Sequence, residues 1–180
     1  KSAKNYFKTL ESLLIDQIIS ESGCHYEKSL DYHNSILFDL SILYFYLEEN
    51  ECTNDSLLFN LKSHIEKMLT FSTSLNFDDK ILINDSFENY HFSSSKLISE
   101  LSKNFNLKSN LSNYPFIELK NNKSIKCIIY ASDINPAHCP AHLHDAISTY
   151  ELWVDESKFI TDSGNYNYLD DSSRNYFRSS

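Results

Sequence analysis

The residues whose types and spacing best suit chemistry lie near the end of the chain, where two histidines stand one residue apart. On an extended segment side chains alternate from face to face, so His142 and His144 point to the same side. Asp162 follows at a spacing that suits a hairpin returning to the same end of a sheet. Two imidazoles and one carboxylate form a common set of zinc ligands. The pattern therefore predicts one polar site that holds two ligands, or one ligand beside a catalytic group.

The chain's only arginines, Arg174 and Arg178, follow this pattern and bracket an aromatic residue, Tyr176. A guanidinium group is planar and always charged, and it can donate two parallel hydrogen bonds to a carboxylate or a sulfate. The remaining basic residues of the chain are lysines and histidines. Guanidinium groups placed among aromatic and acid–base residues indicate one half of a site for a polysaccharide that carries acidic groups.

Composition and charge limit the classes of protein to which the chain can belong. With 41% hydrophobic and 14% aromatic residues, the 180-residue chain can build a packed core. Its net charge of -9 argues against nucleic acid as a partner and, through long-range repulsion, against a very highly sulfated polymer. No apolar run approaches the length that crosses a bilayer. The 4 cysteines form no Cys-x-x-Cys pair, which argues against a zinc ribbon.

The elements that must position these residues change type near residue 110. Before it, apolar residues recur with helical spacing from residue 6 to about 106, which predicts three amphipathic helices and a fourth over roughly 94–105. After it, the chain has short β-branched or aromatic segments separated by turn residues, which is typical of antiparallel strands. These segments are residues 116–119, 125–131, 149–154 and 158–161. We therefore expect a helical part followed by a sheet.

A hairpin near residue 155 places the candidate site at one end of that sheet. The turn Asp155-Glu156-Ser157 predicts that residues 147–154 pair with residues 159–161. In that arrangement His144 lies near the entry of one strand and Asp162 near the exit of its neighbour.

Five sequence segments resemble the heparinase II/III family of polysaccharide lyases. Four of them follow one another in the family's order and spacing in the sheet part. They are Pro140-Ala141-His142-Leu143-His144, Tyr150-Glu151-Leu152-Trp153, Thr161-Asp162-Ser163-Gly164-Asn165-Tyr166-Asn167-Tyr168 and Arg174-Asn175-Tyr176-Phe177-Arg178-Ser179. Upstream, a fifth segment is similar to the family's Gly-x-His-x-Glu motif: Ser22-Gly23-Cys24-His25-Tyr26-Glu27-Lys28-Ser29.

The resemblance implies an α+β multidomain fragment. Residues 1–110 would be the C-terminal part of an (α/α) toroid, and residues 111–180 the N-terminal part of an antiparallel β-sandwich. We expect a fragment because the chain lacks an initiator methionine and stops directly after its most chemically loaded segment. The family's usual location further suggests a periplasmic or cell-surface protein.

The activity that the resemblance implies is cleavage of a uronate-containing acidic polysaccharide by β-elimination. Such a reaction needs a group that neutralises the C5 carboxylate, a base that removes the C5 hydrogen and an acid that protonates the leaving oxygen at C4. On the family's pattern His25 would contact the carboxylate with Glu27 nearby, and His142 would be the base.

The same pattern assigns the remaining roles. Tyr176 or Tyr168 would protonate the leaving group, and Arg174 and Arg178 would orient the acidic sugars. Like two ligands of the family's zinc site, His144 and Asp162 would bind a divalent metal, with a third ligand expected beyond Ser180.

Other classes of function remain open. The chain has Ala146 where the family usually has an aspartate, which favours a non-catalytic carbohydrate-binding or surface-polysaccharide assembly protein as the alternative. A metal-dependent hydrolase built on His142, His144 and Asp162 would leave the two arginines without a role. We interpret three histidines as surface or helix-capping residues: His33, His64 and His91. His138, shortly before the histidine pair, is a further candidate ligand.

Overall fold

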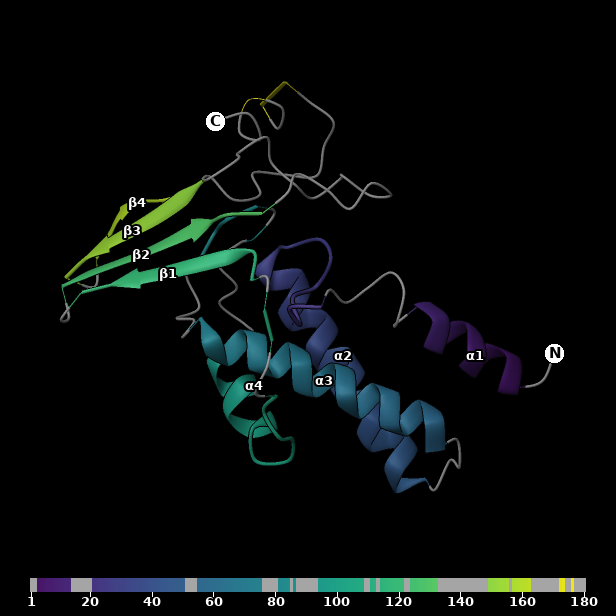
Figure 1. Ribbon diagram of the computed structural model, residues 1–180. Coiled ribbons are helices and arrows are strands. Elements are labelled where there is room, and N and C mark those ends of the chain that lie inside the picture. Colours follow the sequence, from purple (N-terminus) through teal and green to yellow (C-terminus); the bar gives the residue numbers. More distant parts are fainter. Residues whose placement is uncertain are drawn as a thin grey trace.

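The described residues form four helices followed by a four-stranded antiparallel sheet (Figure 1). The computed structural model describes residues 3–13, 21–50, 55–75, 81–84, 86, 94–108, 111–112, 114–121, 124–132, 149–155, 157–162, 172–173 and 176. The helices are α1 (Ala3–Leu13), α2 (Leu30–Glu49), α3 (Asp55–Ser74) and α4 (Ser94–Leu101). The strands are β1 (Phe116–Lys120), β2 (Ile125–Tyr130), β3 (Tyr150–Val154) and β4 (Ser157–Ile160). The predicted α+β class is confirmed.

The helices bury their apolar stripes on one another, as their spacing predicts. Helices α2 and α3 lie side by side, and Leu37, Leu61 and Ile65 in their contact are fully buried. Helix α4 ends at Leu101, earlier than expected, yet Phe105 still packs into this core beyond the helix end. Among the described helices, none combines the length and the apolar content that a bilayer crossing requires.

The four strands lie in sequence order, each antiparallel to the next. The predicted hairpin between β3 and β4 is confirmed, and its turn residue Asp155 has a positive φ of 48°. The pairing places Glu151 of β3 opposite Ile128 of β2. The register shifts between Leu152, which pairs with Ile160, and Trp153, which pairs with Lys158, so one extra residue of β4 lies between the two pairs.

The sheet has one face on the helical part and one face toward solvent. A second core joins Phe116 and Ile128 of the sheet to Phe71 at the end of α3 and Ile83 in a loop before α4. On the opposite face apolar side chains are exposed: Ile117 (46%), Leu119 (53%) and Tyr150 (46%). The second core therefore crosses the expected domain boundary near residue 110.

Candidate functional site

The segment with the Gly-x-His-x-Glu motif forms a buried loop before α2. This loop, residues 21–29, is called the His25 loop. Gly23 has φ +79°, and a Cβ there would overlap the carbonyl oxygen of Lys67 in α3, so the backbone lies directly on that helix. His25 is 4% exposed and Glu27 9% exposed. The hydroxyl of Tyr26 donates to Glu27 Oε1 over 2.9 Å. Two candidate polar groups are therefore held in one buried turn.

A fully buried histidine holds the backbone of this loop. His33, in the first turn of α2, accepts the backbone N–H of His25 at Nδ1 over 3.1 Å. Its Nε2 lies 2.9 Å from Ser72 Oγ and 3.2 Å from the carbonyl oxygen of Met68. Burial lowers the pKa of His33 to about 3, with the charge of His25 acting in the same direction.

The hydrogen bonds of His33 determine its tautomer. Because the backbone N–H donates, Nδ1 is the unprotonated nitrogen, and the neutral ring carries its hydrogen on Nε2. That hydrogen is donated toward the residues of α3. The interpretation of His33 as a surface or capping residue is wrong, because the α2 stripe points this side chain into the interior.

A second loop joins the His25 loop to the sheet. We call residues 81–84 and 86 the bridging loop. Asn84 donates from Nδ2 to the carbonyl oxygen of Lys28 over 2.9 Å. Ser86 Oγ accepts the N–H of Leu30 over 3.2 Å and so caps the first turn of α2. The bridging loop thereby fixes the C-terminal end of the His25 loop.

The segment between β2 and β3 leaves and returns close to the His25 loop. Lys28 Nζ donates to Ser132 Oγ over 2.7 Å, just after β2 ends. The N–H of Tyr130 donates to the carbonyl oxygen of Thr149 over 2.8 Å, directly before β3. Residues 133–148, which carry the paired histidines, lie outside the described residues. The attachment points of that segment therefore lie beside the His25 loop.

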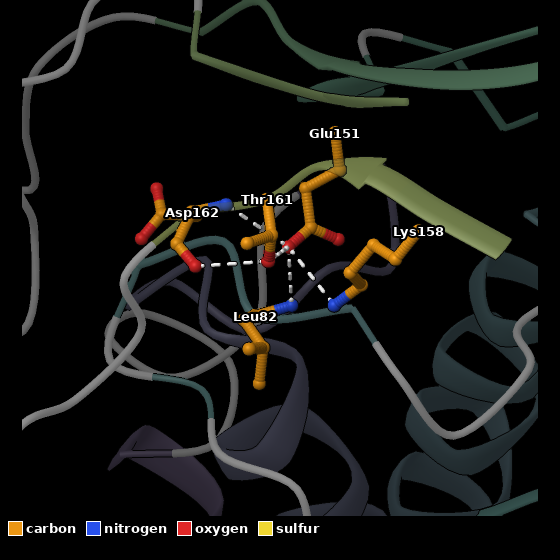
Figure 2. A network of polar contacts seen from close by, with 5 residues as sticks. All are labelled: Leu82, Glu151, Lys158, Thr161 and Asp162. Carbon is orange, nitrogen blue, oxygen red and sulfur yellow. Dashed lines mark hydrogen bonds and ion pairs between the residues drawn. The ribbon is translucent and has the colours of Figure 1, made fainter. Parts of the chain in front are cut away.

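A buried carboxylate collects donors from three parts of the chain at the same sheet end (Figure 2). Glu151 is 0% exposed, and its Oε1 accepts four hydrogen bonds of 3.0–3.3 Å. The donors are the N–H of Leu82 in the bridging loop, Nζ of Lys158, Oγ1 of Thr161 and the N–H of Asp162. The network therefore connects the predicted metal ligand Asp162 to the helical part.

The electrostatics of Glu151 reflect two opposing influences. Burial raises the pKa of its carboxyl above the usual range, while the charge of Lys158 and the bonds from Leu82 and Thr161 act to lower it. The second oxygen, Oε2, is buried and has no hydrogen-bond partner among the described residues. The hydrogen bonds that this side chain makes with the described residues thus all fall on Oε1.

The structure describes only part of the predicted site. His25 and Glu27 share the buried loop, Asp162 is partly buried next to β4, and Tyr176 is 69% exposed. The other predicted residues lie outside the described residues: His142, His144, Tyr168, Arg174 and Arg178. Within the described part, no three His, Cys, Asp or Glu side chains gather as metal ligands. The roles of the site residues therefore stay predictions.

Sequence reasoning missed two residues that organise this region, His33 and Glu151. Both stand at positions whose periodicity points inward. His33 lies three residues after Leu30 and four before Leu37 on the buried stripe of α2. Glu151 alternates with Trp153 on the strand face that packs on the helical part. A polar residue at an inward position of a periodic pattern was the available signal.

Solved structures share this arrangement of helices packed against an antiparallel sheet. Heparan sulfate lyase HepC from Pedobacter heparinus matches with a TM-score of 0.67 at 19% identity, over 99% of this chain and 32% of that one. Heparinase III matches with a TM-score of 0.64 at 19% identity, over 96% and 33%. The chain spans about a third of the length of these proteins.

A family model matches the sequence of the sheet part. Residues 110–180 match the family described as heparinase II/III-like, C-terminal. This region contains the four sheet-part segments quoted above. The resemblance of the chain to the heparinase II/III family of polysaccharide lyases is confirmed. No curated protein sequence matches the chain.

Proposed function

We propose that the protein is a lyase that cleaves a uronate-containing acidic polysaccharide by β-elimination. The family match over residues 110–180 is the observation that carries the proposal, because this region contains both the histidine pair and the arginines. The hydrogen bond from Lys28 to Ser132 adds support, since it joins the His25 loop to the start of the histidine segment.

The reaction assigns a distinct task to each polar group. His25 donates a hydrogen bond to the C5 carboxylate and so lowers the cost of the negative charge that develops when the C5 hydrogen leaves. His142 takes that hydrogen as a proton, and the electron pair forms the C4–C5 double bond as the C4–O bond breaks. The leaving oxygen then takes a proton from Tyr176 or Tyr168. Glu27 orients the sugar beside His25.

The charge of the chain affects which polymers can be bound. A net charge of -9 repels a polyanion at long range, so local cations must provide the attraction. Arg174 and Arg178 would supply it by pairing with sugar carboxylates in a two-bond geometry. We therefore expect a polymer with carboxylates and few sulfates to be preferred over a fully sulfated one.

We also propose that His144 and Asp162 bind a divalent metal, zinc being the best match to this donor set. An imidazole and a carboxylate suit zinc, and the backbone of Asp162 is held by Glu151. When bound, the metal would keep the loop that carries the histidines in shape. By the same resemblance we expect the protein to act in the periplasm or at the cell surface.

An ultraviolet assay tests the proposal. The full-length protein is incubated with a panel of alginate, glucuronan and heparan sulfate, the last because two structurally similar proteins are a heparan sulfate lyase and a heparinase. Elimination creates an unsaturated sugar, so ultraviolet absorbance grows with time. His142→Ala should lower the rate by at least about a hundredfold, because a positioned base contributes that much. His64→Ala, at a partly buried position on α3, is the matched control.

The other outcomes point to other functions. Polymer binding without absorbance growth would favour the non-catalytic carbohydrate-binding or assembly protein, to which Ala146 already points. New reducing ends without absorbance growth would indicate a hydrolase. Equal loss of rate in both histidine variants would remove His142 from the role of base.

A further inference from the structure

Glu151 lies where the sheet, the bridging loop and Asp162 meet. Its Oε1 accepts the backbone N–H of Leu82 over 3.1 Å and the backbone N–H of Asp162 over 3.2 Å. The backbone at Leu82 and the backbone at Asp162 are far apart in sequence, yet both bind the same carboxylate oxygen. Figure 2 shows both groups directed at the same carboxylate oxygen.

We propose that Glu151 is a positioning residue that sets Asp162 and the end of β4 against the helical part of the site. The inference rests on the proposed function for its effect on catalysis, although not for its effect on the two backbone segments. Glu151 acts through Asp162 and Leu82.

The position of Glu151 is a costly place for a carboxylate. A charge taken out of water costs several kcal/mol unless partners compensate, and Glu151 is 0% exposed. Its strand partner Ile128 occupies the same sheet face at 0% exposure with an apolar side chain. A β-branched apolar residue at 151 would serve the sheet equally well. What the carboxylate adds is an acceptor for donors that lie outside the sheet.

A continuous path of contacts leads from this carboxylate to the His25 loop. Leu82 belongs to the bridging loop, whose Asn84 donates to the carbonyl oxygen of Lys28 over 2.9 Å. On the sheet side, Thr161 Oγ1 adds a third donor to Glu151 over 3.0 Å. A change in this acceptor would therefore shift the sheet end and the His25 loop relative to one another.

Amide hydrogen exchange and steady-state kinetics on the full-length protein test the proposal together. Glu151→Met keeps the side-chain length but removes the acceptor, so the Leu82 and Asp162 amides should exchange roughly tenfold faster or more, because a hydrogen bond to a charged group is lost. With the active polymer, kcat should fall by about tenfold or more at a KM within about threefold, because misplacement affects the reacting geometry.

Two further variants make the result specific. Glu151→Gln keeps an oxygen that can accept both backbone N–H groups, so it should restore most of the protection and of kcat relative to Glu151→Met. Thr161→Val removes one donor at an exposed position and should give a smaller loss in the same direction. It also keeps the network testable should Glu151→Met fail to fold.

Glu118→Met is the matched control. Glu118 lies on the same sheet face, in β1, with a side chain 11% exposed and lysines at 3.7 and 3.9 Å. Among the described residues its polar partners are Lys120 and Lys126, and it forms no hydrogen bond with Leu82 or Asp162. Its substitution should leave both amides and kcat close to wild type.

Each contrary outcome has one meaning. Unchanged exchange at Leu82 and Asp162 in Glu151→Met, or an equal change in Glu118→Met, overturns the proposal. Faster exchange with an unchanged kcat in an active protein overturns the positioning role. Absence of lyase activity in wild type defeats the proposed function instead, and the exchange rates still decide whether Glu151 holds the two segments.

Discussion

His33 is a buried residue that holds the backbone of His25. It accepts the His25 backbone N–H at Nδ1 and donates from Nε2 toward Ser72 and Met68 of α3. Only the neutral imidazole can accept at one nitrogen and donate from the other. These hydrogen bonds of the His25 loop therefore require His33 to stay uncharged, with its one ring hydrogen on Nε2.

The pKa of His33 makes stability depend on pH in a stated direction. The unfolded chain takes up a proton at the ordinary value of 6.5, whereas the folded chain does so only at about 3. Between these values the unfolded state binds more protons, so stability falls as the pH drops from 6.5 toward 3. His33→Asn should be less stable than wild type at pH 7.5, and the gap in melting temperature should narrow at pH 5.

His33→Gln provides the comparison for this prediction. Asparagine can place an acceptor near the Nδ1 position and glutamine a donor near Nε2, so the two variants keep different hydrogen bonds. Neither asparagine nor glutamine titrates at this position. For both variants, the gap in melting temperature from wild type should therefore narrow between pH 7.5 and pH 5. A gap in melting temperature that stays constant from pH 7.5 to pH 5 in both would contradict the assignment of a neutral, buried His33.

Among the elements, the His25 loop is shaped by contacts with neighbours on three sides. Gly23 lies against the α3 backbone at Lys67, Asn84 of the bridging loop bonds to Lys28, and the Lys28 side chain bonds to Ser132 of the sheet part. The loop has little regular secondary structure of its own. Its conformation therefore depends on tight backbone approach.

Gly23→Ala tests that dependence. The added Cβ would overlap the Lys67 carbonyl oxygen, and alanine is strained at φ +79°. We expect the free energy of unfolding to fall by at least about 2 kcal/mol, because backbone strain and overpacking both contribute. Glu21→Ala, an exposed change in the same loop, is the control and should lie within about 0.5 kcal/mol of wild type. Similar melting temperatures for both variants would contradict the close approach.

At the scale of the whole molecule, the two faces of the sheet lie in different environments. One face shares a core with the helical part, while the other presents Ile117, Leu119 and Tyr150 at 46–53% exposure. An apolar sheet face of this kind is typical of the inner surface of a β-sandwich. We therefore expect a second sheet to cover it in the full-length protein.

Leu119→Lys tests for that covering layer. A lysine buried between two sheets costs several kcal/mol, whereas at a solvent-exposed position the change would fall within about 0.5 kcal/mol. We expect the melting temperature of the full-length protein to fall by several degrees. Ser124→Lys, in the exposed turn between β1 and β2, should leave it nearly unchanged. Equal melting temperatures for the two variants would mean that this face of the sheet is exposed to solvent in the full-length protein.

The amino-acid sequence by itself determined the order and type of the elements. Apolar residues at helical spacing predicted α2 and α3, and alternation with turn residues predicted the hairpin of β3 and β4. These signals are local, because each depends on neighbours within one or two turns of the chain. The family resemblance likewise rested on short contiguous segments such as Thr161-Asp162-Ser163-Gly164.

Only the tertiary structure decided how the site is supported. His33 is a buried acceptor because α2 packs on α3, and Glu151 is a junction because its strand meets Leu82, a residue far away in sequence. The end of α4 at Leu101 and the core shared by helices and sheet also depend on contacts between elements. Such partners are specified by the burial of whole surfaces, and no spacing within a single segment encodes them.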